Sequence, residues 1–161
     1  MNPKLTTSRF LINLKACNSQ LALFEKVFPR GARLSEANVV KAAKAGLNLD
    51  WLAMETLSGP ARAEYEKARD SALAEFEKAR VPALVEFEKA CDPALAEYQK
   101  ACNLAKYDKT LDPAYTEYMK VRGPAWAKYE KIRDLAWSDY QKVCGLAWLK
   151  LFIKTKKGET I

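Results

Sequence analysis

The sequence predicts an all-α protein. A small N-terminal helical cap, residues 1–58, precedes a curved, proline-punctuated helical hairpin built from 11-residue repeats, residues 59–155. Three observations predict this fold: the chain repeats itself from Gly59 onward, the apolar residues inside each repeat have helical spacing, and the repeat changes register near 108–112. Residues 156–161 are expected to form a short basic tail.

The first part of the cap is expected to be one helix followed by a turn. Thr7 or Ser8 can cap a helix that runs through Phe28, because a hydroxyl oxygen accepts a hydrogen bond from a free backbone N–H of the first turn. The Pro-Arg-Gly sequence at 29–31 then favours a turn.

Two shorter helices are expected to complete the cap. Ser35 caps a helix that continues to about Ala45 and is ended by Gly46, since glycine readily adopts the left-handed conformation that ends many helices. Asp50 is expected to cap a third helix that begins at Trp51. Without the cap, one end of the repeat array would expose apolar surface.

The repeats predict helix and give no support for strands. With Gly59 as position 1, Ala stands at position 3, an aromatic residue at position 7, and Ala, Val or Ile at position 10 of each full unit before the last. Spacings of four, three and four residues are helical, because eleven residues close three turns. The successive units read GPARAEYEKAR, DSALAEFEKAR, VPALVEFEKAC, DPALAEYQKAC, NLAKYDKTL, DPAYTEYMKVR, GPAWAKYEKIR, DLAWSDYQKVC and GLAWLKLFIKT.

A helical wheel places positions 10, 3, 7, 11 and 4, in this order, on one apolar face. Position 4 changes from Leu in the early units to Tyr and then Trp in the late ones. Positions 6 and 9 carry Glu and Lys pairs on the solvent side, and we assign no function to them.

Proline recurs at position 2, on the solvent side of the wheel. Each of these prolines either opens a new helix or kinks a continuing one, and both outcomes bend the chain toward its apolar face. The nine-residue unit at 103–111 breaks the phase of the repeat, which predicts a turn around 108–111, with Asp112 as the cap of the second arm. The prolines concerned are Pro60, Pro82, Pro93, Pro113 and Pro124.

Arginine at position 11 is the most unusual feature of the apolar face. A guanidinium among aromatic residues is costly to bury alone, and it suits an anionic ligand or stacking on a ring. One hypothesis is a recess for a phosphate-bearing or nucleobase ligand. The hypothesis we favour from the sequence is that these arginines stack on Tyr or Trp and pair with Glu of the other arm or of a second chain. The candidate binding residues are Arg69, Arg80, Arg122, Arg133, Trp126, Tyr129, Trp137 and Tyr140.

The composition argues against catalysis. The chain has no His, which excludes Ser-His-Asp triads, Cys-His dyads and His-ligated metals. Its four cysteines form no C-x-x-C pair and are expected to be free apolar thiols. We therefore expect no enzymatic activity, no cofactor and no metal. No segment reads as a signal peptide or a membrane span, which favours a cytoplasmic location.

The run AEYEKAR, VEFEKAC, AEYQKAC and AKYEKIR, with PAL and PAW between, resembles the tandem AEYEKV-type repeats of hypothetical phage and prophage proteins. The resemblance covers residues 59–155 and implies a phage accessory protein in the host cytoplasm. By analogy with other small phage proteins, it implies a non-enzymatic binding protein, in counter-defence, that sequesters a host factor.

Two alternatives stay open: a sponge for a nucleotide-derived immune signal, and a structural repeat protein that assembles with itself. The expected partner is thus a host protein or an anionic small-molecule signal. The chain has 27 Lys and Arg against 20 Asp and Glu but no long basic block, so nucleic acid is not an expected partner. Aromatic residues left exposed on one flank of the hairpin favour a homo-oligomer.

Overall fold

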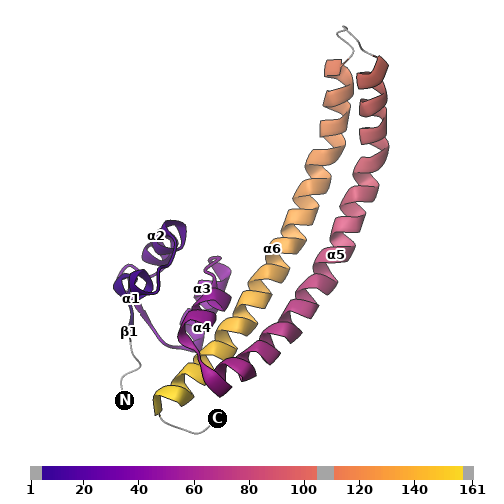
Figure 1. The fold of residues 1–161 in the computed structure, drawn as a ribbon. Coiled ribbons are helices and arrows are strands. Elements are labelled where there is room, and N and C mark those ends of the chain that lie inside the picture. Colours follow the sequence, from indigo (N-terminus) through magenta and orange to yellow (C-terminus); the bar gives the residue numbers. More distant parts are fainter. Residues whose placement is uncertain (1–4, 105–110, 158–161) are drawn as a thin grey trace. The chain divides into compact units, whose positions relative to one another are not determined.

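The computed structural model describes residues 5–104 and 111–157 and confirms the all-α class. Six helices and two very short strands follow one another in this part of the chain (Figure 1). The elements are β1 (Leu5–Thr6), α1 (Ser8–Asn13), α2 (Asn18–Val27), β2 (Ala32–Arg33), α3 (Glu36–Lys44), α4 (Leu49–Thr56), α5 (Gly59–Leu104) and α6 (Leu111–Lys157).

The chain divides into two compact units. The first unit holds the residues up to Glu75 and those from Trp137 onward, and the second unit holds Phe76–Ala136. The first unit therefore combines the cap with the beginning of α5 and the end of α6, whereas the second unit consists of the remaining parts of these two helices. The curvature predicted for the whole hairpin involves both units and stays a prediction.

The single helix predicted from Thr7 to Phe28 is wrong, because two helices occupy this segment. Thr7 caps α1 as expected, its hydroxyl accepting from the N–H of Phe10. Lys15 then adopts a left-handed conformation with φ 61°, and the N–H groups of Lys15 and Ala16 bond back to the carbonyls of Ile12 and Leu11. These two bonds form a Schellman stop. Lysine rarely adopts this conformation, so no residue type in this segment predicts the stop.

The second half of the cap follows the predicted pattern in part. Ser35 caps α3 through the N–H of Asn38, and Gly46, with φ 85°, follows its C-terminus. The predicted cap at Asp50 is wrong: α4 is capped by Asn48, whose side chain accepts from the N–H of Trp51. Asp50 lies inside the first turn of α4, and its carboxylate accepts a hydrogen bond from the Tyr65 hydroxyl instead.

The cap is not purely helical. Leu5 and Thr6 of β1 pair antiparallel with Arg33 and Ala32 of β2. Each strand has only two residues, which is too short to produce a recognisable sequence pattern. The pairing connects the beginning of the cap to the segment that follows α2.

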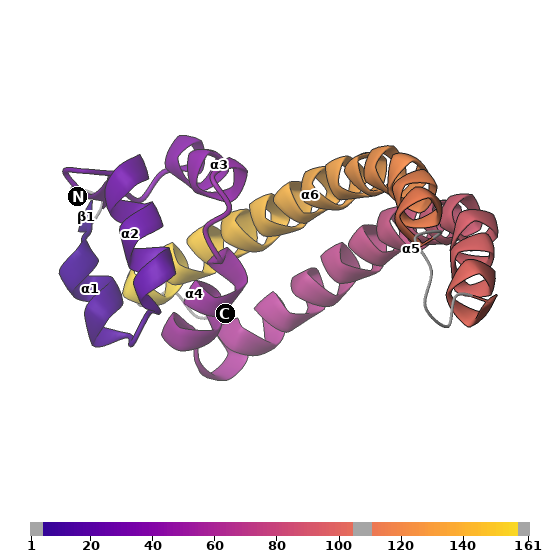
Figure 2. The same ribbon diagram turned by 90° about the horizontal axis from the view of Figure 1, so that it is seen from above.

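The cap and the end of α6 share one core in the first unit. Phe24, Phe28 and Leu52 of the cap are buried, as are Trp148 and Leu149 of α6. Figure 2 shows α3 and α4 beside the C-terminal part of α6. As predicted, the cap covers apolar surface of the repeat array. An apolar pocket of about 60 Å³ remains in this core, with Phe24, Phe28, Leu52 and Trp148 in its lining.

The long helices continue through their prolines. Pro82 and Pro93 lie inside α5 and Pro124 inside α6, all three exposed as the wheel predicts. Pro60 and Pro113 lie in the first turns, where a missing N–H removes no helical bond. Pro60 and Pro113 thus stand at the openings of α5 and α6, one of the two predicted outcomes, whereas Pro82, Pro93 and Pro124 lie within continuous helices. The turn predicted around 108–111 lies largely outside the described residues, and α6 begins at Leu111, ahead of the predicted cap at Asp112.

The repeat lattice has a narrower buried face than the wheel predicts. In the second unit the residues at positions 3, 7 and 11 include the buried Ala83, Cys91 and Tyr129. Position 10, which was expected on the apolar face, is exposed at Ala90 and Val121. The buried face is therefore centred on position 7, and positions 10 and 4 form its two flanks.

Candidate functional site

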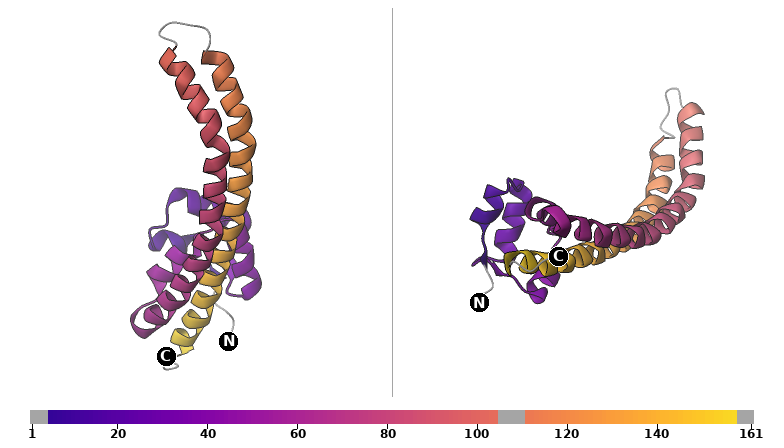
Figure 3. Two further views of the ribbon diagram at one scale, coloured as in Figure 1. Left: turned by 90° about the vertical axis from the view of Figure 1, so that its right-hand side faces the viewer. Right: turned by 60° about the horizontal axis from the view of Figure 1, so that its bottom comes forward.

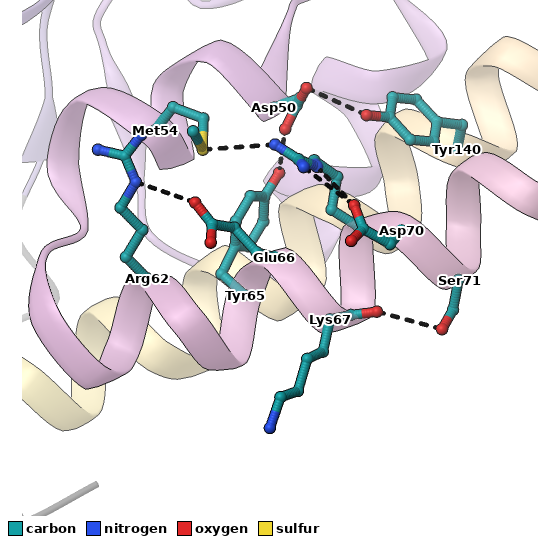
Figure 4. Close-up of polar contacts among 10 residues, drawn as sticks. Asp50, Met54, Arg62, Tyr65, Glu66, Lys67, Asp70, Ser71 and Tyr140 are labelled. Atoms are coloured by element: carbon teal, nitrogen blue, oxygen red, sulfur yellow. Dashed lines mark hydrogen bonds and ion pairs between the residues drawn. The ribbon is translucent and has the colours of Figure 1, made fainter.

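The predicted site residues of the first unit surround a polar cluster. The Tyr140 hydroxyl donates to one carboxylate oxygen of Asp50 at 3.0 Å, and the Tyr65 hydroxyl donates to the other at 2.7 Å (Figure 4). One carboxylate of α4 thus joins a tyrosine of α5 to a tyrosine of α6. Trp137 is 38% exposed and stacks on Tyr140 with ring centroids 5.0 Å apart.

This cluster holds its protons tightly. Burial raises the pKa of the Tyr65 and Tyr140 hydroxyls far above the usual range, and the Asp50 carboxylate that accepts from them acts in the same direction. Burial likewise raises the pKa of the Cys144 thiol between them. The two hydroxyls and the thiol therefore stay protonated near neutral pH.

Arg69 is the predicted arginine of the first unit, and it is satisfied locally. Its guanidinium pairs with Asp70 at 2.9 Å and lies 3.8 Å from the sulfur of Met54. The ion pair joins neighbouring residues of α5, so the Arg69 charge is already paired within its own helix.

The remaining predicted arginines lie in the second unit, and two of them, Arg80 and Arg133, pair with a carboxylate as Arg69 does. Arg80 pairs with Glu77 at 2.7 Å, and Arg133 pairs with Asp134 at 2.8 Å. The Arg133 guanidinium also lies over the Tyr129 ring, 5.7 Å from its centroid. Arg133 thus stacks on a ring as predicted, whereas the carboxylates that pair with Arg80 and Arg133 come from their own helices and not from the other arm.

Arg122, the last of the predicted arginines, stacks on Trp126, and its guanidinium carbon lies 5.6 Å from the ring centroid. Trp126 in turn meets Phe87 of α5 edge to face at 5.3 Å, and Tyr98 of α5 stacks on Tyr118 of α6 at 5.9 Å. Figures 1 and 3 show α5 and α6 side by side through the second unit. These aromatic residues thus form part of the contact between the two helices in the second unit.

A groove of about 460 Å³ lies on the opposite flank of the second unit. Its lining comes from positions 2, 3, 6, 7, 9 and 10 of the two helices, and we call this surface the groove. The lining residues are Ala83, Glu86, Phe87, Lys89 and Ala90 of α5 and Pro124, Ala125, Lys128, Tyr129 and Ile132 of α6.

The groove exists because the two flanks of the repeat differ in side-chain size. On one flank, large residues at position 4, such as Trp126, fill the space beside the helix contact. On the other flank, α5 carries Ala83 at position 3 and Ala90 at position 10, and α6 carries Ala125 at position 3. A methyl group cannot fill the space that an indole fills, so an open channel remains over Tyr129.

The groove has charged edges. The Lys128 ammonium of α6 reaches Glu86 of α5 at 2.8 Å, and the two side chains are 69% and 63% exposed. Lys128, and to a smaller extent Lys89, lower the pKa of the Glu86 carboxyl below its usual range. Two ammonium groups therefore face a single carboxylate at these edges.

Sequence reasoning missed this groove. The repeat pattern predicts a solvated face without function for Glu86 and Lys89, and it predicts a place on the apolar face for Ala90. The readable signal was the contrast in size between position 10, where α5 has only Ala, and position 4, where Leu or Trp predominate. Gln141 was also missed: it is buried, and its carbonyl oxygen accepts from the N–H groups of Leu49 and Asp50 at the start of α4.

The cysteines are free thiols throughout the described residues, as predicted. Burial raises the pKa of the Cys91 thiol, as it does for Cys144, whereas Cys17 is exposed and does not fit the expected apolar setting. Within residues 5–104 and 111–157, no group of three or more Cys, Asp and Glu side chains is placed to hold a metal ion. None of the described helices has an apolar stretch long enough to cross a lipid bilayer.

The comparisons with known proteins give no further guide. No protein-family model, no curated protein and no solved structure matches the chain.

Proposed function

We propose that this protein is a non-enzymatic binding protein that takes a helical segment of a partner protein into the groove of the second unit. The observation that carries the proposal is the groove itself, an opening of about 460 Å³ along two packed helices. A third helix is the natural complement of such a surface, because amphipathic helices place their apolar side chains into grooves of this kind.

The chemistry of the lining supports a protein partner. Alanine, Phe87 and Tyr129 form an apolar floor, and charged side chains stand only at the edges. An apolar floor with a polar rim is the usual anatomy of a protein interface.

The resemblance of the repeats to phage accessory proteins gives the proposal its biological setting. The partner is then a host protein, bound stoichiometrically, and the binding acts in counter-defence. The nucleotide sponge has less support, because Arg69, Arg80 and Arg133 are already paired with carboxylates of their own helix.

The test fills the groove with a large side chain. Ala90→Trp places an indole in the groove at an exposed position, and Ala96→Trp makes the same change at an exposed position of α5 outside the lining. Tagged wild-type protein and both variants are used to purify complexes from host cells, and their circular dichroism is compared first. We expect one host protein at a one-to-one ratio with the wild type and Ala96→Trp, and its loss with Ala90→Trp. Equal recovery with all three proteins would refute the groove as the binding site.

A further inference from the structure

We infer that the occupant of the groove is an acidic amphipathic helix, with carboxylates on both sides of its apolar stripe. This inference rests on the proposed function and adds the chemistry of the partner. It is carried by the spacing of the small residues on the floor and by the placement of the lysines at the edges.

The floor has the length of about two helical turns. Ala83 and Ala90 lie seven residues apart on α5, and Ala125 and Ile132 lie seven apart on α6. Seven residues span about 10.5 Å along a helix. An occupant lying along the groove can therefore place apolar side chains at i, i+3 or i+4, and i+7 against this floor.

Each edge of the groove carries one lysine, and the lining as a whole has two lysines against one carboxylate. Lys89 belongs to α5 and Lys128 to α6, so each helix contributes one ammonium group to its own edge of the groove. Glu86 is the single carboxylate among the lining residues, and it is paired with Lys128. An occupant with a carboxylate on each flank would place one negative charge beside Lys89 and one beside Lys128.

The ion pair between Glu86 and Lys128 does not close the groove firmly. Both side chains are largely exposed. Ion pairs of this kind contribute little to stability, because water screens them and two long side chains must be ordered to form them. A carboxylate of the occupant can therefore replace Glu86 as the ion-pair partner of Lys128, while a second carboxylate pairs with Lys89.

A basic occupant would meet the opposite situation. Its ammonium groups would face Lys89 and Lys128 and would compete for Glu86 alone, and like charges placed side by side at an interface disfavour the complex. The groove thus discriminates between helices of equal apolar character by the sign of their flanking charges.

The experiment uses two synthetic helical peptides with the same leucine stripe, one flanked by Glu and one by Lys. Their binding to the full chain is measured by fluorescence anisotropy. We expect the Glu peptide to bind about tenfold more tightly at low salt, and the difference to shrink as salt screens the exposed charges. The double variant Lys89→Glu with Lys128→Glu should reverse the preference. A matched control, Lys100→Glu with Lys150→Glu, changes the net charge equally outside the groove lining and should keep it.

The outcomes separate this inference from the proposed function. If both peptides bind equally and Ala90→Trp abolishes both, the acidic partner is refuted while the groove remains the binding site. If the Glu peptide binds Ala90→Trp as well as it binds the wild type, the groove itself is refuted as the site. Failure of both peptides to bind overturns the helical occupant.

Discussion

Asp50 shows how one side chain can organise several helices. Its two carboxylate oxygens accept separately from Tyr65 and Tyr140, and its own helix is capped by Asn48 rather than by Asp50. Charged acceptors strengthen hydrogen bonds, and both tyrosines are buried. The cluster therefore ties α4, α5 and α6 together within the first unit, and it sets how the stability of the protein responds to alkali.

Stability is expected to fall as the pH rises above about 9. The folded protein raises the pKa of Cys144 above its ordinary value of 9.0, and that of Tyr65 and Tyr140 above 10.0. A group whose pKa is raised in the folded state contributes its full stabilisation below its ordinary pKa. This contribution is lost as the pH rises from the ordinary pKa toward the folded-state pKa. Each such group lowers the unfolding free energy by up to about 1.4 kcal/mol per pH unit. Urea unfolding at pH 7, 9 and 10.5 measures this loss.

A variant without the two hydroxyls tests the assignment of this effect. Tyr65→Phe with Tyr140→Phe should be less stable at pH 7, because Asp50 loses both donors, and its stability should fall less steeply above pH 10. A double variant with the same alkaline slope as the wild type would show that these tyrosines do not cause the loss.

At the scale of helices, Gly145 marks a close approach within the first unit. A Cβ atom at this position of α6 would lie 2.5 Å from the Leu49 Cδ1 atom and 2.6 Å from the Val39 Cγ1 atom. Glycine is therefore needed here for the packing of α6 against α3 and α4. Gly123, in the same helix, is exposed and has no atom within 4 Å of such a Cβ.

The two glycines should respond oppositely to alanine. Gly145→Ala is expected to destabilise the protein by about 1–3 kcal/mol, because a methyl group overpacks a closed contact. Gly123→Ala should stabilise it by about 0.5–1 kcal/mol, since alanine restricts the unfolded chain and favours helix. Urea unfolding of both variants provides the comparison. Destabilisation by Gly123→Ala, or none by Gly145→Ala, would contradict the described packing.

At the scale of the whole molecule, the protein is predicted to be a homodimer or a larger assembly. In the second unit Tyr115 and Leu135 are exposed, and in the first unit Trp137 is exposed. Exposed aromatic and aliphatic side chains of this size favour association, because burying them removes apolar surface from water. Light scattering should give at least twice the 18.2 kDa of one chain. A mass equal to one chain would refute the prediction.

The class and the hairpin could be read from the sequence because they depend on local spacing. An aromatic residue every eleven positions and prolines confined to position 2 predict long helices with one buried face, whatever lies against that face. Ser35 and Gly46 could be placed in the same way, since a cap and a left-handed stop involve only a few neighbouring residues.

Tertiary structure alone decided which side chains meet. Asp50 reads as a helix cap in the sequence, yet its partners stand 15 and 90 residues away. The groove likewise depends on which flanks of α5 and α6 are left open once the aromatic residues have packed together. Local spacing determines the period of a helix, but the partner of each side chain depends on contacts between segments far apart in the chain, and a period of eleven residues does not encode them.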